Sequence, residues 1–176
     1  MPTTGASAAS PDPRPASRRA GLLADRIEEG AAKLAAYVER LSEAQWRQPI
    51  SATDRRTVGV VVHHVAFIYP IEIEAARAIG SGKAVETAWP AIAQLNAKHA
   101  GDNADVTKAA ALELLARNSR EAAAAVRAFT DEELDRAASF GLSDGAPVTA
   151  QYVIEDHAMR HAWHHLAKIR EAVGRA

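Results

Sequence analysis

The chain has 176 residues, a length that suits one compact domain with a substantial core. It contains no cysteine, which excludes disulfides, zinc-thiolate sites and a cysteine nucleophile. The 21 Lys and Arg against 22 Asp and Glu give a net charge of -1, and aromatic residues make up 5% of the chain. These values favour neither nucleic-acid binding nor attraction to a membrane surface. We therefore expect no nucleic-acid partner and no membrane partner.

The first 17 residues are rich in Pro, Ala, Ser and Thr, a composition that predicts a disordered tail. This segment lacks the charged start and apolar run of a secretory signal. No stretch approaches the ~20 apolar residues of a membrane span. We predict a cytoplasmic protein in which residues 18–176 form a single helical domain.

The apolar residues recur every three to four positions in several long segments, which predicts amphipathic helices. A first helix is expected over 18–41, followed by an irregular connection. The second helix is expected to begin at Thr53, Asp54 or Thr57 and to reach Ile79, with a kink at Pro70 because an internal proline removes a backbone hydrogen bond.

The rest of the chain continues the helical pattern. A shorter helix is expected at 89–100 and a long one at 107–129, after which Thr130 and Glu133 form a capping box that opens a helical turn. A loop over 141–147 precedes a last helix over 148–173. No strand pattern is apparent, so the fold class predicted is all-α, a four-helix bundle with an extra short helix.

Four of the seven histidines lie within nine positions of the last predicted helix. At about 100° per residue, His165 falls on the apolar face and His161 on its rim, so this i, i+4 pair lies on the core side. His157 and His164 fall progressively further out. Neighbouring imidazoles four residues apart can bind one metal ion.

The second predicted helix carries adjacent histidines that the same count separates. His64 points inward or along the rim, whereas His63 points toward solvent. Glu72 falls on the apolar face, where a carboxylate needs a partner, so it is a candidate for supporting a metal ligand or contacting substrate.

The bundle interior can therefore gather His64, His161 and His165. Three neutral imidazoles with an open fourth position are typical of a catalytic metal site, and nitrogen ligands suit zinc, nickel or iron. A lone histidine near a core is more often simply hydrogen-bonded there, but the clustering favours metal binding.

The segments 41–66 and 161–169 resemble the DinB-like superfamily of four-helix-bundle metalloenzymes, which includes YfiT-type proteins and mycothiol-dependent maleylpyruvate isomerases. His64 matches the family's single metal histidine, and His161 with His165 matches its two-ligand helix. Trp89, Asn96 and His99 resemble a segment near the site in some relatives, although a helix-end position would leave His99 solvated.

The resemblance implies a bundle with a long crossover connection, a homodimer and a small-molecule substrate. It also implies a thiol-dependent transferase or isomerase in which the metal activates a low-molecular-weight thiol. Arg55 and Arg56 could contact a carboxylate of that thiol, although a solvated helix start is the more common explanation of such a basic cluster. Three alternatives stay open: a metal-dependent hydrolase, a non-catalytic metal-binding stress-response dimer, and a helical interaction module without metal.

Overall fold

The computed structural model describes residues 17–174. Residues 1–16, which make up nearly all of the predicted tail, lie outside this range, while Ser17 caps the first helix by accepting a hydrogen bond from the Ala20 amide. The elements in chain order are α1 (Arg18–Val38), α2 (Glu43–Arg47), α3 (Val58–Gly80), α4 (Trp89–Asp102), α5 (Lys108–Arg127), α6 (Asp131–Asp135), β1 (Ala137–Ser139), β2 (Pro147–Thr149), α7 (Ala150–Val153) and α8 (Arg160–Gly174).

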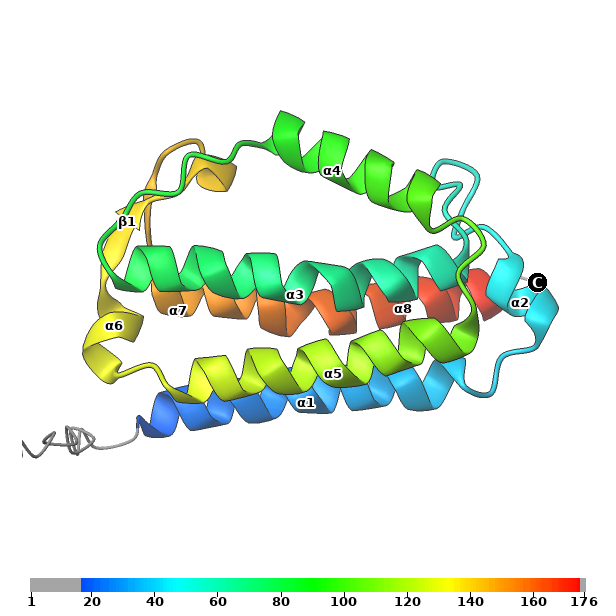
Figure 1. Cartoon of the computed structure of the whole chain (residues 1–176), viewed down its shortest axis with the longest axis horizontal. Coiled ribbons are helices and arrows are strands. Elements are labelled where there is room, and N and C mark those ends of the chain that lie inside the picture. The colour runs from blue at the N-terminus through cyan, green and yellow to red at the C-terminus, as the bar shows by residue number, and fades with distance from the viewer. Residues whose placement is uncertain (1–16, 175–176) are drawn as a thin grey trace, which may run out of the picture.

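Four long helical segments form the predicted bundle (Figure 1). Helix α5 packs against both α1 and α3, and α8 packs against α1. Figure 1 shows that α3 and α5 run in the same direction, because the connection between them, which contains α4, crosses back along the outside of the bundle. This long crossover confirms the predicted topology and places α4 beside α3 instead of inside the core.

Side-chain caps define the helix starts. Thr57 is the N-cap of α3, since its hydroxyl accepts from the Val60 amide, which settles the three candidates proposed from the sequence. The capping box of Thr130 and Glu133 is present as predicted and opens α6. A second capping box, formed by Ser42 and Gln45, opens α2 in a segment that we expected to be irregular. The sequence interpretation therefore missed one short helix.

Helix α3 continues across Pro70, whose ring is exposed, and ends only at Gly80. Among the described residues it is the one helix long and apolar enough to cross a membrane on length and composition alone, whereas we expected no stretch to approach that length. Two thirds of its most apolar stretch, 67%, is buried inside the bundle. This burial is what a core helix of a bundle requires.

The segment after α6 corrects the prediction of an uninterrupted loop and helix. Strands β1 and β2 pair antiparallel with Ala138 opposite Val148, so Val148 belongs to a strand and not to the last helix. The turn contains Asp144 and Gly145, both with positive φ of 54° and 79°. An Asp-Gly pair is a common hairpin signal, because both residues tolerate positive φ. That dipeptide could have revealed the hairpin.

The last helical segment contains a second departure from the prediction. Between α7 and α8, residues Ile154–Met159 form a π-helix. A π-helix has a wider turn than an α-helix, so side chains on either side of it are rotated relative to the positions that a constant 100° per residue assigns. The segment lies in the wall of the pocket described below, as π-turns often do at functional sites.

The packing of α2 against α3 depends on a glycine. Trp46 is 2% exposed, donates from Nε1 to the Val106 carbonyl at 3.0 Å, and lies directly over Gly59. A Cβ at Gly59 would come within 2.6 Å of the indole ring. Only glycine permits this approach.

We expect Gly59→Ala to lower the free energy of unfolding by about 1–3 kcal/mol, because the buried indole must shift and weaken its hydrogen bond. Gly21→Ala is the matched control: a Cβ there meets nothing within 4 Å, so alanine should be neutral or stabilise α1 by up to about 1 kcal/mol. Urea denaturation of both variants measures the difference. Equal stability of the two variants would contradict the proposed contact.

Candidate functional site

Three histidines from two helices meet in the bundle interior. His64 lies on α3, and His161 and His165 lie one turn apart on α8. One ring nitrogen from each lies within 4.8 Å of the others, and the Nε2 atoms of His64 and His161 are 3.2 Å apart. The structure thus brings together the three residues selected from the sequence, and their geometry could hold a metal ion.

Glu72 supports this cluster from α3, two turns after His64. Its side chain is 7% exposed, and its Oε1 accepts a hydrogen bond from Nδ1 of His161 at 2.6 Å. With Nδ1 engaged by the carboxylate, Nε2 of His161 faces His64. A carboxylate that orients an imidazole in this way is the usual supporting arrangement around a histidine-ligated metal. The predicted inward position of Glu72 is confirmed.

Burial keeps two of the imidazoles neutral. Desolvation, assisted by the neighbouring His161, lowers the pKa of His64 to about 3 and also lowers the pKa of His165. The Nδ1 atoms of both rings are buried and have no hydrogen-bond partner among residues 17–174. Neutral imidazoles with unshared nitrogen lone pairs can bind a metal directly, since histidine is a metal ligand in its neutral form.

The neighbouring histidines behave differently from one another. His164 is exposed, as the face count predicted, and lies at the edge of the pocket lining. His157, in the π-helix, is half-buried, lines the pocket, and packs edge-on against the Phe140 ring at 5.4 Å between centroids. The count of 100° per residue placed His157 further from the bundle interior than the structure does. That count assumed α-helical geometry through Ile154–Met159.

Two further expectations were wrong. His63 does not point freely to solvent: its Nδ1 is 2.8 Å from Nε2 of His99. His99 is not a solvated helix end but is 5% exposed, packed on Phe67 and edge-on to His64 at 5.7 Å. Desolvation lowers the pKa of His99 to about 4. The reason for both errors is α4, which the crossover lays against this face of α3.

The two arginines proposed from the sequence separate in the structure. Arg56 lines the pocket and forms an ion pair with Asp54, its Nη2 2.7 Å from Oδ2. Arg55 is exposed and does not line the pocket. Only Arg56 is therefore placed to meet a ligand in the pocket.

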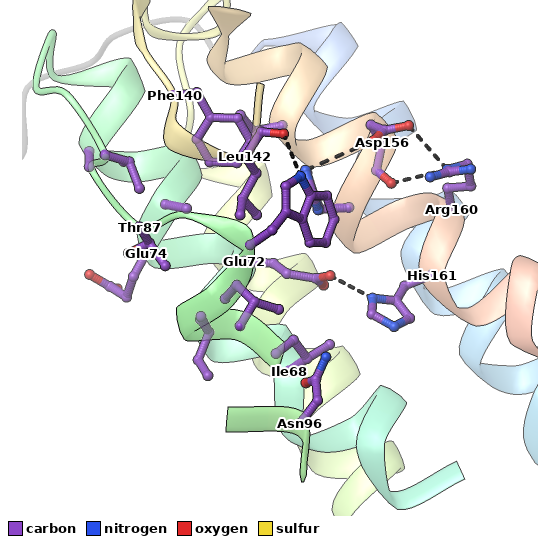
Figure 2. A pocket seen from close by; sticks show the side chains of 18 of the residues that line it. Ile68, Glu72, Glu74, Thr87, Asn96, Phe140, Leu142, Asp156, Arg160 and His161 are labelled. Carbon is purple, nitrogen blue, oxygen red and sulfur yellow. Dashed lines mark hydrogen bonds and ion pairs between the residues drawn. The ribbon is translucent and has the colours of Figure 1, made fainter. Parts of the chain in front are cut away.

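A cavity of about 690 Å³ adjoins the three histidines. Figure 2 shows Ile68, Glu72 and His161 in its wall. Asn96 from α4 lies at the bottom of the view, and Phe140 and Leu142 from the hairpin lie at the top. Asp156 and Arg160 pair across 3.1 Å at its rim. The sequence interpretation missed Phe140 and Leu142, because it did not recognise the hairpin that carries them.

Comparison with known proteins identifies the family. The DinB superfamily model matches residues 26–169, which is most of the chain. The chain belongs to the DinB superfamily. No curated protein sequence matches it.

A solved structure confirms the DinB-like fold. The chain is similar to YfiT from Bacillus subtilis, with a TM-score of 0.72 and 23% identity over 95% of this chain and 93% of that one. YfiT is described as "a probable metal-dependent hydrolase with an unusual four-helix bundle topology". At this identity the likeness establishes the fold, which is the four-helix bundle predicted from the sequence.

The contact between His99 and His63 is expected to hold α4 on the bundle. His99→Ala removes a buried hydrogen bond and the packing on Phe67, so amide exchange in α4 should accelerate about tenfold, a local loss of about 1.4 kcal/mol. Hydrogen-exchange mass spectrometry measures this for the peptides of α4, α1 and α5. Gln94→Ala, at an exposed position of α4, is the control and should leave exchange unchanged. Unchanged exchange in the His99 variant would show that other contacts hold α4.

Proposed function

We propose that this DinB superfamily member is an enzyme that uses a divalent metal held by His64, His161 and His165. The observation that carries the proposal is the convergence of three imidazole nitrogens within 4.8 Å, beside an open cavity of about 690 Å³. Three protein ligands with an open side are typical of catalytic metal sites, whereas structural sites are closed by four. The nitrogen donors suit zinc, nickel or iron better than magnesium or calcium.

The surrounding residues favour an open site. Glu72 holds the ring of His161, and burial keeps His64 neutral. Asp156, a conceivable fourth ligand, instead pairs with Arg160. These contacts favour catalysis over the alternative of a non-catalytic metal-binding protein.

The nucleophile that we propose is the sulfur of a low-molecular-weight thiol, which makes the protein a thiol-dependent transferase or isomerase. A divalent cation bound there would lower the pKa of a thiol, or of water, and so supply the nucleophile. The chain contributes the open pocket beside the histidines, and Arg56 at its edge could bind a carboxylate of the thiol. A homodimer and a small-molecule substrate are part of the same proposal.

A metal-dependent hydrolase is the second candidate. It is supported by the likeness to YfiT, which is described as a probable enzyme of that class. The same histidines and Glu72 would serve, with water in place of the thiol. The two candidates differ in whether a thiol binds at the site.

The ligand assignment predicts that His64→Ala abolishes metal retention, because it removes one of three donors. His63→Ala is the matched control, since its ring faces His99 and not the cluster, and it should retain metal nearly as the wild type does. Elemental analysis of protein purified without a histidine tag measures the bound metal. Equal loss in both variants would show that the cluster is not the binding site, and absence of metal in the wild type after loading would overturn the proposed function.

The thiol proposal predicts that binding of a thiol to metal-loaded protein releases a proton near neutral pH, because the thiol binds as its thiolate. Calorimetry of a panel of thiols in two buffers of different ionisation enthalpy measures this release. Metal-free protein and His165→Ala should show no such binding. If no thiol binds to metal-loaded protein, the transferase proposal fails and hydrolysis becomes the leading function.

A further inference from the structure

The cavity next to the histidines is elongated and has two chemically different ends. Its lining on α3 runs from His64 to Ala78, which at 1.5 Å per residue spans about 21 Å along the helix axis. On the opposite wall the lining runs from His165 back to Val153. The histidine cluster therefore occupies one end of the cavity, and the space continues well beyond it.

The end remote from the histidines is apolar. His157 reaches it through its edge-on contact with Phe140. The carboxylates nearby lie at the rim: Glu86 is exposed, and Glu74 is exposed and pairs with Arg77. This apolar compartment is lined by Ala75 and Ala78 of α3, Val85 and Trp89 of the crossover, and Phe140 and Leu142 of the hairpin.

Large apolar side chains are left exposed around this compartment. Trp89 is 56% exposed and Ile71 is 38% exposed, although both line the cavity. The Trp89 indole is held in place, because its Nε1 donates to the Leu142 carbonyl at 3.0 Å. An apolar surface that is fixed in place and concave is typical of a ligand site.

A polar anchor lies at the histidine end. Asn96 lines the cavity from α4, one turn before His99, and its Oδ1 is buried with no hydrogen-bond partner among the described residues. The second carboxylate oxygen of Glu72, Oε2, is also buried and unpaired there. Buried acceptors without partners are costly, so a ligand that donates N–H or O–H groups at this end would satisfy them.

From these observations we infer the substrate class: an elongated amphipathic molecule whose polar, hydrogen-bond-donating head lies at the histidines and Asn96, and whose alkyl or aryl tail fills the apolar compartment. The inference rests on the proposed metal function for the head only. The tail site depends on the hairpin and α4 and exists without a metal. Chain length is then a determinant of specificity, and Ala78 marks the far end of the compartment.

The test is calorimetric titration of zinc-loaded protein with linear alkyl hydroxamic acids, from acetohydroxamic to dodecanohydroxamic acid. The hydroxamate head binds zinc and offers a hydrogen-bond donor. Each methylene that the tail adds in the apolar compartment should lower Kd by up to about fourfold, and the whole series should lower it by at least about a hundredfold. Ala78→Trp should remove the gain of the longest chains only, because only their tails reach the far end of the compartment. Ala167→Trp, at an exposed position of α8 outside the cavity, is the control and should bind as the wild type does.

A second variant separates head from tail. Asn96→Leu should weaken every hydroxamic acid by a similar factor of about three to ten, because the contact that it removes is to the head. Melting temperatures of all variants check that they fold.

The outcomes distinguish this inference from the proposed function. If the hydroxamic acids bind with a Kd that does not depend on chain length, the amphipathic substrate class is wrong while the metal site stands. If the protein retains no zinc, the proposed function fails. The tail site is then tested by itself, by comparing the binding of 1-octanol and 1-butanol to metal-free protein. Tighter binding of 1-octanol that Ala78→Trp abolishes would support the compartment, and equal binding would overturn it.

Discussion

The hydrogen bond between Glu72 and His161 joins the two helices on which the candidate site depends. Glu72 lies on the buried face of an apolar helix, where a carboxylate without a partner would cost several kcal/mol. His161 on α8 is that partner at 2.6 Å. Pairing them fixes the relative position of α3 and α8, and with it the approach of His64 to His161 and His165. The interaction that engages Oε1 of the buried carboxylate is thus also the one that assembles the histidine cluster.

The crossover between α3 and α5 gives this cluster a pocket. In a bundle with short loops, α3 and its successor would run antiparallel and leave the outer side of α3 bare. Here the long connection carries α4 back along α3, with Trp89 held to the hairpin at one end and His99 held to His63 at the other. The topology therefore places a helix over the histidines without filling the space beneath it. That space is the cavity.

The π-helix at Ile154–Met159 has a comparable effect on the opposite wall. It ends two residues before His161, and its wider turn brings His157 and Asp156 to the cavity. The α-helical spacing of His161 and His165 is preserved, because both lie beyond it in α8. Regular geometry is kept where two imidazoles must share one face, and it is relaxed where the wall of the pocket is formed.

The sequence by itself determined the all-α class, the long helices, the capping box that opens α6, and the inward positions of His64, Glu72, His161 and His165. Each of these follows from local rules, since periodicity and capping act within one or two turns of a helix. The resemblance to the DinB-like superfamily added the long crossover connection.

Tertiary structure alone decided the surroundings of His63, His99 and His157, the position of Phe140 in the pocket wall, and the separation of Arg55 from Arg56. These depend on which segments, distant in the chain, pack together. His99 is buried only because the crossover lays α4 on α3, and His157 reaches the pocket only because the last helix departs from α-helical spacing. A pattern read along one helix carries no information on the helix that covers it, which is why the ligand candidates could be predicted and the pocket could not.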